Sequence, residues 1–553
     1  MKRYVNRRNA AALLALLLLW MQSSCVETGT KANFDGWAAL ERPDKGASET
    51  QRENKIDSKR IGPANKKTTI FTLFTSGGCG CTGSGGPPVT FTTNEQVVEA
   101  LEKACDGVDF AVWEGERSGA YDEVRGNQGR YDGALIFGNI DRDYRLAFTG
   151  LPTIVVYNLF EFMNLPYYLF ATGKFHEDAI LTGGTDYEDV KILTAQLDRR
   201  NLCDRHLSEK MFNDLVYKIK LIQVIKELGK TRILMLTPGI NDNIAQVNYR
   251  GDFNQSFPKD HNERYTRNLK ELFGVEIVRV DAEEFYELYR KLDIGKAEQI
   301  AEEWINGARR VEASRPEIIK AARAYLAIEA LREKYNCNAV STHLRSVTGS
   351  RELKDRFNPG IGLELGFKTR GIQAVCQNYP DILLSQVLAY LLTSRPSMLG
   401  DVIFDIDNSV EIVLHCGIPI NPYGDERRIP YTIRTHAESP VRDIPEEAGS
   451  STGLTAEWPL GEPVTFWEIH SLHKQIRVHT GEVVDGHAIY TGEDLDNVMC
   501  TAKIIAALDA ERIRSRHLPY LYGIHTNVTL GDLRGQIKDI GVLLGFDVVE
   551  SDR

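Results

Sequence analysis

The chain has 553 residues, of which 42% are hydrophobic, 26% are charged and 9% are aromatic. This is an ordinary globular composition, so it excludes a collagen, a disulfide-framed miniprotein and a mostly disordered chain. The net charge is −11, from 66 basic and 77 acidic residues, whereas nucleic-acid binders concentrate positive charge on one face. We therefore expect no nucleic-acid partner. At roughly 100–200 residues per domain, the length predicts about three domains.

Residues 1–25 have the pattern of a secretory signal peptide, because a basic segment, a short apolar run over 10–21 and two serines precede Cys25. The apolar run is shorter than the roughly 20 residues that cross a bilayer. A buried N-terminal helix is the alternative interpretation. Cys25 after Ser-Ser is similar to the acylated cysteine of a bacterial lipoprotein, so Cys25 is the candidate lipid anchor. The sequence thus predicts an exported protein of the periplasm or cell envelope.

The rest of the chain divides into a linker and three folded regions. Residues 26–66 are polar, charged and poor in aromatic residues, which predicts a linker. Strand and helix patterns then alternate over 67–195 and again over 196–358, which predicts two α/β domains with parallel sheets. Residues 359–553 contain one helical segment and then many short strands and turns, which predicts a β-rich C-terminal domain.

A glycine-rich loop with two cysteines, Cys79 and Cys81, fills residues 76–86 after the first predicted strand. Backbone N–H groups of such loops can cradle phosphates. The spacing fits neither G-x-G-x-x-G nor G-x-x-x-x-G-K-[ST], so a surface loop is favoured over a nucleotide site. The cysteines of the chain fit no zinc framework, since no Cys-x-x-Cys pair occurs. We expect most of them to be buried free thiols.

The C-terminal region carries a family resemblance. Residues 371–419 contain a strand ending in Cys, a loop, a helix ending in Leu-Thr-x-x-Pro, an Asp, and a strand leading into His-Cys-Gly. Residues 523–549 contain a Gly-x-His segment followed by Leu-Gly-Asp-x-Arg at a helix start. This pattern resembles the core of the L-fucose isomerase and L-arabinose isomerase superfamily. Segments 462–470 and 481–484 are similar to the strands between. The family has two Rossmann-like domains before a β-rich domain, which suits the division above.

The resemblance implies aldose–ketose isomerisation. Family members hold a divalent cation, usually Mn²⁺, with carboxylates and a histidine, and acid/base carboxylates move a proton through an ene-diol. A hard cation prefers oxygen ligands, and general acid–base transfer needs positioned titratable groups. By position, His525 is the metal-binding histidine that the resemblance implies. His525 would then share one site with the loop at 376–381, so we expect the two segments to lie within about 10 Å of one another.

The sequence departs from the family at two positions. Gln377 replaces a glutamate and Tyr379 replaces the metal-binding aspartate. A neutral amide and a protonated phenol are weaker cation ligands than carboxylates, and neither is a base near neutral pH. We therefore assign Gln377 and Tyr379, together with His415, to substrate binding rather than to catalysis. Weak or no isomerase activity on common deoxy-hexoses and pentoses is expected.

Two other carboxylates could fill the vacant catalytic roles. Asp381 lies two residues after Tyr379, and Glu364 is the nearest upstream carboxylate that could face the same cleft. The alternative interpretations are an aspartate at a helix N-terminus and a glutamate on the surface.

Two classes of function remain open. The first is a sugar isomerase-like protein of carbohydrate metabolism, which either isomerises a sugar with displaced carboxylates or has lost its metal. The second is a non-catalytic carbohydrate-binding periplasmic lipoprotein, because two α/β lobes with a cleft also describe periplasmic binding proteins. Both predict a small-molecule sugar as the partner. The family forms trimers and hexamers, so a homo-oligomer is expected from the resemblance.

Overall fold

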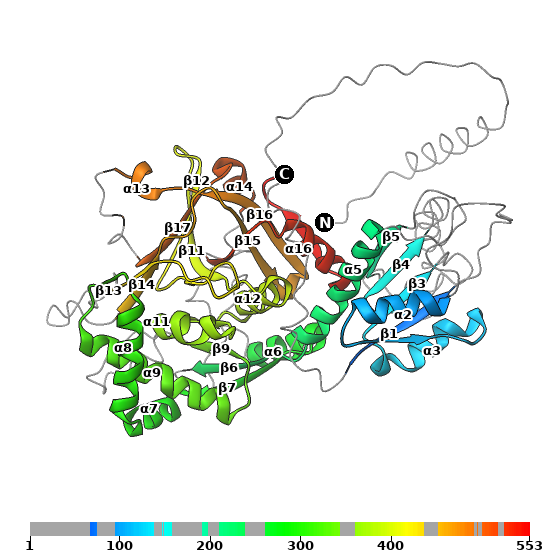
Figure 1. Cartoon of the computed structure of the whole chain (residues 1–553), viewed down its shortest axis with the longest axis horizontal. Helices are drawn as coiled ribbons and strands as arrows, with labels where there is room; N and C mark the ends of the chain where they lie inside the picture. The colour runs from blue at the N-terminus through cyan, green and yellow to red at the C-terminus, as the bar shows by residue number, and fades with distance from the viewer. Residues whose placement is uncertain are drawn as a thin grey trace, which may run out of the picture. The chain divides into compact units, whose positions relative to one another are not determined.

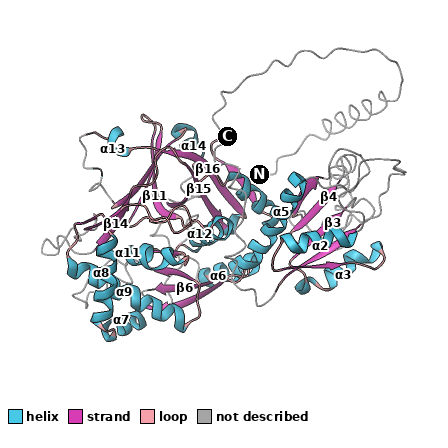
Figure 2. Cartoon of the chain, viewed as in Figure 1, coloured by secondary structure: helices cyan, strands magenta, loops and turns pink. Residues whose placement is uncertain are grey.

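The structure is a computed structural model, and Figures 1 and 2 show its helices and strands. It describes residues 67–74, 94–137, 146, 149–157, 191–196, 209–237, 260–342, 360–435, 452–491, 495, 500–517 and 525–553. The predicted signal peptide, the predicted linker and the glycine-rich loop lie outside the described residues. In the part of the chain that is described, no helix is long and apolar enough to cross a membrane.

The first sheet is entirely parallel, with the strand order β2-β1-β3-β4-β5. Its strands are β1 (Thr68–Phe74), β2 (Val108–Val112), β3 (Gly133–Phe137), β4 (Thr153–Tyr157) and β5 (Ile192–Gln196). Helix α2 (Asn94–Ala104) connects β1 to β2, and α3 (Ala120–Gly126) lies between β2 and β3. Most residues of β1 and β3 are buried, because helices cover the faces of a parallel sheet. The order 2-1-3-4-5 is one of the two common orders of doubly wound sheets.

A second parallel sheet has the order β10-β9-β6-β7. Its strands are β6 (Arg232–Thr237), β7 (Glu276–Asp281), β9 (Ala339–Thr342) and β10 (Ala374–Val375), and its helices are α5 (Glu209–Leu228), α6 (His261–Phe273), α7 (Ala282–Lys291), α8 (Ile294–Gly307) and α9 (Arg315–Lys334). Asp281 and Asp293 start α7 and α8, because each side chain accepts a hydrogen bond from the backbone N–H two residues later. Strand β10 belongs to this sheet although it follows residue 358, the predicted domain boundary.

The C-terminal region contains a closed ring of antiparallel strands. Its strands are β11 (Met398–Asp405), β12 (Val410–His415), β15 (Pro463–His470), β16 (Gln475–Val483), β17 (Ala502–Ala507) and β18 (His525–Leu530). The order is β15-β18-β11-β12-β17-β16, and β15 also pairs with β16, which closes the barrel. β19 (Asp547–Glu550) adds to β16 in parallel, and the short helices α13 (Gly486–Ile489) and α14 (Ala510–Arg516) join these strands. Closure removes the exposed strand edges that would otherwise pair with other chains.

Further elements join the barrel to the second sheet. Before β10 come α11 (Gly360–Gly362), a π-helical turn η7 (Leu363–Phe367) and a 3₁₀ turn η8 (Lys368–Arg370), and after it comes α12 (Pro380–Thr393). A small sheet has the order β14-β13-β8, from β14 (Thr452–Ala456), β13 (Tyr431–Thr435) and β8 (Arg310–Val311). Helix α16 (Arg534–Leu544) follows β18. Helix α5 contacts α12 and α16 as well as β1 and β5 of the first sheet.

The barrel buries both of its faces around β15 and β16. Val464 and Phe466 belong to an apolar cluster on one face. Trp467 and Ile469, on the alternate face, belong to a larger cluster that includes residues of α12, α16 and the first sheet. The mixed α/β class with parallel sheets and a strand-rich C-terminal region is therefore confirmed. The ring closure and the place of β10 in the second sheet are not signalled by local sequence patterns.

Candidate functional site

The candidate site lies where three distant segments meet. Strand β10 ends at Val375 and continues into Cys376, β12 ends at His415, and β18 begins at His525. In the barrel, His525 pairs with Asp401 of β11. The rings of Tyr379 and His525 have centroids 4.5 Å apart. The expected meeting of the 376–381 loop with His525 is thus confirmed.

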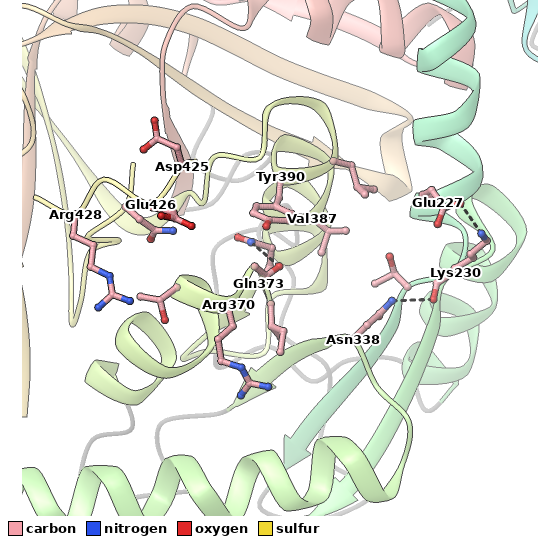
Figure 3. A pocket seen from close by; sticks show the side chains of 16 residues that line it. Glu227, Lys230, Asn338, Arg370, Gln373, Val387, Tyr390, Asp425, Glu426 and Arg428 are labelled. Carbon is pink, nitrogen blue, oxygen red and sulfur yellow. Dashed lines mark hydrogen bonds and ion pairs between the residues drawn. The ribbon is translucent and has the colours of Figure 1, made fainter. Parts of the chain in front are cut away.

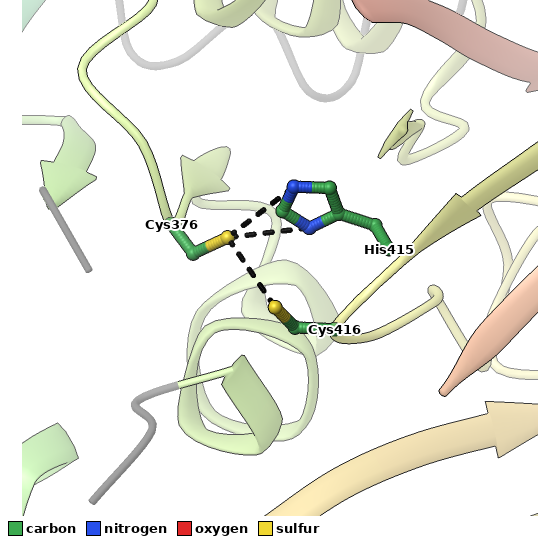
Figure 4. Close-up of side chains that lie close together, drawn as sticks. All are labelled: Cys376, His415 and Cys416. Carbon is green, nitrogen blue, oxygen red and sulfur yellow. Dashed lines mark hydrogen bonds between the residues drawn. The ribbon is translucent and has the colours of Figure 1, made fainter. Parts of the chain in front are cut away.

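Cys376, His415 and Cys416 form a buried cluster that could hold a metal ion (Figure 4). The Cys376 Sγ lies 3.2 Å from His415 Nδ1 and 4.0 Å from Cys416 Sγ. All three side chains are buried, each with less than a twentieth of its surface exposed. A ligand atom from each residue lies within 4.8 Å of the others.

The end of β12 explains how two consecutive residues can face the same point. Within a strand, neighbouring side chains alternate between the two faces of the sheet. β12 ends at His415, and the backbone bends at Cys416, so the alternation stops there. Gly417 follows, and a Cβ at that position would lie 2.8 Å from the Cγ of Glu364. A glycine is therefore needed where this bend packs against the π-helical turn.

Asp401 and His525 form a paired acid and imidazole beside Tyr379. The His525 Nε2 lies 3.0 Å from the Asp401 Oδ1, and the His525 side chain is buried while about a quarter of the Asp401 side chain is exposed. Burial raises the pKa of Asp401, but His525 outweighs it and the net shift is downward. Burial lowers the pKa of His525 and raises that of Tyr379. The site therefore holds an ionised carboxylate, a neutral imidazole and a neutral phenol near neutral pH.

His415 is more basic than an ordinary histidine. Burial lowers its pKa, but the neighbouring thiols of Cys416 and Cys500 and the carboxylate of Asp401 outweigh burial and raise the pKa to about 9. The centroids of the His415 and His525 rings are 6.0 Å apart. The Cys/His/Cys cluster and the Asp401–His525 pair are therefore adjacent parts of one region.

Glu364 lies in the π-helical turn and is buried, with 6% of its surface exposed, so the alternative that placed it on the surface is wrong. Lys368 Nζ donates to the Glu364 Oε1 at 2.9 Å and to the Ser397 carbonyl at 2.8 Å. The other carboxylate oxygen of Glu364, Oε2, has no hydrogen-bond partner in the part of the chain that the structure describes. Burial raises the pKa of Glu364, and Lys368 only partly offsets this. π-helical turns occur frequently at functional sites.

A small cavity of about 10 Å³ lies between Glu364 and the cluster. Glu364, Lys368, Cys376, His415 and Cys416 are among the residues that line it. This volume is about that of one water-sized probe, so the cavity fits one water molecule or ion and no monosaccharide.

Asp381 and Gln377, two of the predicted site residues, are not among the residues that line this cavity. Asp381 lies in the first turn of α12, as its alternative interpretation stated, and it is fully buried against Tyr265 and Ser471. Burial raises its pKa to about 6 in spite of hydrogen bonds from Ser471 and Tyr265. Gln377 is half-buried, and its carbonyl accepts a hydrogen bond from the Ser341 hydroxyl. The structure thus groups Glu364 with His415, and Tyr379 with His525.

Sequence reasoning missed Asp401 and the thiols of Cys376 and Cys416. The Asp after Leu-Thr-x-x-Pro was part of the family pattern, but its partner could not be known without the register that sets Asp401 opposite His525. The His-Cys pair at the end of a strand is the local signal for the cluster. Its third member, Cys376, follows a different strand, β10, so no Cys/His spacing along the chain reveals it.

A much larger cavity lies elsewhere, with a volume of about 990 Å³. Glu227, Lys230 and Asn338 line one side of it, and Asp425 and Arg428 line another (Figure 3). The cavity shares no lining residue with the small cavity beside Glu364. Charged, amide and aromatic side chains line it together with aliphatic ones, a mixture that can bind both the hydroxyl groups and the ring face of a sugar.

Comparison of the chain with models of known protein families and with curated proteins finds no match in either case.

Proposed function

We propose that this chain is a sugar isomerase-like protein of carbohydrate metabolism, with weak aldose–ketose isomerase activity. The proposal rests on the sequence resemblance and on one observation: Tyr379 and His525, which come from distant segments, lie with ring centroids 4.5 Å apart beside Asp401. An imidazole oriented by a carboxylate, next to a phenol, is a proton-transfer arrangement. The parallel sheets are consistent with the two Rossmann-like domains of that family.

The proposed chemistry is the removal of a proton next to a carbonyl and its return to the neighbouring carbon. Because the His525 Nε2 lies 3.0 Å from the Asp401 Oδ1, the carboxylate favours the proton on Nε2, which leaves on Nδ1 the lone pair that can take the proton. The neutral phenol of Tyr379 can donate a hydrogen bond to the oxygen on which charge develops. The partly exposed carboxylate of Asp401 is where an open-chain sugar can approach this pair.

The donors at this site do not fit Mn²⁺ well. Mn²⁺ prefers carboxylate, carbonyl and water oxygens, whereas the buried cluster offers two thiols and an imidazole. Among the described residues, Asp401 is the carboxylate that pairs with His525, and Glu468 acts on His525 only through its charge. We therefore derive no step through Mn²⁺, and the expected loss of activity follows from the same deficit of anionic oxygen ligands.

Hydrogen exchange at the sugar tests this proposal. L-fucose, L-arabinose and other aldoses are incubated with the full-length protein in D₂O, and proton NMR measures the replacement of the hydrogen at C2. We expect slow exchange that Asp401→Asn reduces by about 10²–10⁴-fold, because His525 loses the carboxylate that sets its tautomer and orientation. Asp547→Asn, at an exposed aspartate of β19, is the matched control and should leave the rate unchanged. An unchanged rate in Asp401→Asn would contradict the assignment of this pair.

The second candidate is a non-catalytic carbohydrate-binding lipoprotein. The large cavity lined by Asn338, Tyr390 and Asp425 favours it, because amides, carboxylates and aromatic rings suit sugar hydroxyls and ring faces. Calorimetric titration that detects sugar binding, together with no exchange at C2, would support this function over isomerisation.

Export and assembly are part of the same proposal. We propose that the chain is carried to the periplasm or cell envelope and anchored through Cys25, and that it forms a homo-oligomer. Both follow from the sequence pattern and the resemblance.

A further inference from the structure

We propose that Cys376, His415 and Cys416 bind a borderline-soft divalent cation of the Zn²⁺ class, with a water in the fourth position beside Glu364. This site goes beyond the proposed isomerase function and does not depend on it. A cation could serve structure or catalysis here whether or not a sugar is the substrate.

The distances match the edges of a tetrahedral site. Zinc binds cysteine sulfur at about 2.3 Å and histidine nitrogen at about 2.0–2.1 Å, so neighbouring ligand atoms of a tetrahedron are roughly 3.5–3.8 Å apart. Cys376 Sγ lies 3.2 Å from His415 Nδ1, 3.7 Å from His415 Nε2 and 4.0 Å from Cys416 Sγ. The two edges that Cys376 makes are therefore within a few tenths of an ångström of tetrahedral values, and a His415 nitrogen lies within 4.8 Å of Cys416 Sγ.

The donor types select the cation. Thiolates favour zinc and copper(I), and imidazole suits zinc, whereas calcium, magnesium and manganese prefer oxygen. Three protein ligands with an open fourth position are the pattern of catalytic zinc sites, and two cysteines with one histidine are a known set. The cluster combines this set with almost complete burial. Burial excludes bulk water from competition for the ion.

Glu364 supplies a second, independent observation. Its side chain is more than nine-tenths buried, its Oε2 has no hydrogen-bond partner among the described residues, and it lines the same small cavity as the three ligands. Lys368 holds Oε1, which leaves Oε2 for another group. A water in this cavity could bind the cation and donate to Oε2, since the cavity has about the volume of one water. Hydrogen bonds of this kind orient metal ligands and tune their acidity.

Cobalt(II) substitution tests the site in the full-length protein. The reduced protein is stripped with a chelator and titrated with Co²⁺, and absorption spectroscopy detects thiolate-to-cobalt charge transfer and tetrahedral ligand-field bands. We expect one equivalent of Co²⁺ to produce both signals and Zn²⁺ to abolish them. Cys376→Ser and Cys416→Ser should each lose the charge-transfer intensity from one thiolate and weaken binding by more than about tenfold. Cys337→Ser, at a buried cysteine outside the cluster, is the matched control and should bind as the wild type does.

Glu364→Gln separates the role of the carboxylate from folding. This variant should still bind Co²⁺ with both thiolates, but the pH at which the bound water ionises, read from the ligand-field bands, should change. Circular dichroism checks that each variant is folded. In wild type and control, bound Zn²⁺ should protect the thiols from an alkylating reagent, which gives a second measure of binding.

Three results would overturn the proposal. The first is wild-type protein with reduced thiols that shows no thiolate charge transfer with Co²⁺ and no protection by Zn²⁺. The second is a charge-transfer band that persists unchanged in both cluster variants. The third is a disulfide between Cys376 and Cys416 that forms in place of metal binding and persists under the reducing conditions used for loading. The sugar exchange assay is independent of all three, so failure of the metal site and failure of the proposed function can be told apart.

Discussion

The carboxyl group of Asp381 lies in the interior of the fold, where its charged form is unfavourable. It is fully buried, and burial raises its pKa from 3.8 to about 6. The folded chain therefore holds this proton more tightly than the unfolded chain does. The stability that this group contributes is fully present below about pH 3.8 and is lost as the pH rises through about 6.

Asp381→Asn should remove this pH dependence. The amide has nearly the same shape and can still accept from the Ser471 N–H, but it carries no charge. A shift of about two pKa units corresponds to about 3 kcal/mol, so the variant should be more stable than the wild type at pH 7 by up to that amount. Urea denaturation at several values between pH 4 and 7 measures the effect, with Asp547→Asn as the exposed control. If the free energy of unfolding changed with pH in the same way for the wild type and Asp381→Asn, the Asp381 carboxyl would not titrate as described.

The two substitutions that separate this chain from the isomerase pattern should have unequal effects. Tyr379 lies against His525, whereas Gln377 is half-buried and its backbone is bound to Ser341. Tyr379→Asp would put a second carboxylate beside Asp401, and like charges favour a bound cation that neutralises them. We therefore expect Gln377→Glu with Tyr379→Asp to raise Mn²⁺ affinity, with most of the gain from Tyr379→Asp. Electron paramagnetic resonance of free Mn²⁺ measures it, and a gain that comes from Gln377→Glu alone would contradict the geometry.

At the scale of elements, the alternation of strands and helices was readable from the sequence, but the pairing of strands was not. β-Branched and aromatic runs such as residues 68–74 predict strands because local side chains determine that preference. By contrast, the barrel requires β18 to pair with β11, and the site requires Asp401 to lie opposite His525. Such register depends on contacts between segments far apart in the chain. His525 and Tyr379 could be placed together only through the family resemblance, whereas the grouping of Cys376 with His415 and Cys416 needed the structure.

A buried ion pair crosses from β15 to β16. Glu468 and Arg477 are opposite residues of the two strands, their charged groups are 2.9 Å apart, and neither side chain is exposed. Burial raises the pKa of Glu468, but Arg477 and His470 outweigh it and the net shift is downward. The carboxylate therefore remains charged inside the barrel and depends on its partner.

Arg477→Met should destabilise the barrel by about 3–5 kcal/mol, because it leaves a buried charge without its partner. The double variant Glu468→Gln with Arg477→Met should recover part of the loss. Lys103→Met, which removes the exposed ion pair with Glu99, is the control and should change the stability little. Thermal and urea unfolding monitored by circular dichroism provide the comparison. Equal stability of Arg477→Met and the wild type would mean that water or another group compensates Glu468.

At the scale of the whole molecule, one apolar core connects the parallel sheets to the barrel. Val156 of the first sheet, Met235 of the second and Trp467 of the barrel belong to the same buried cluster. α5 and α12 pack against one another within it. The three folded regions predicted from the sequence are therefore joined by shared packing rather than by linkers alone.

The N-terminal segment should be removed when the protein is exported. We expect the mature chain to begin at or near Cys25, because residues 1–25 have the order of a signal peptide. Intact mass spectrometry of protein recovered from the cell envelope measures this, and Cys25→Ala should lack any added lipid mass. A mature protein that still contains residues 1–24 would contradict export by cleavage.

X-ray absorption spectroscopy at the zinc edge tests the central claim most directly, namely that the ends of β10 and β12 form a metal centre beside the Asp401–His525 pair. The protein loaded with one equivalent of Zn²⁺ should show two sulfur atoms at about 2.3 Å and two nitrogen or oxygen atoms at about 2.0–2.1 Å. The sulfur atoms would be Cys376 and Cys416, and Cys376→Ser should leave one. A shell of oxygen and nitrogen alone, which would place the ion at Asp401 and His525 instead, would contradict the account.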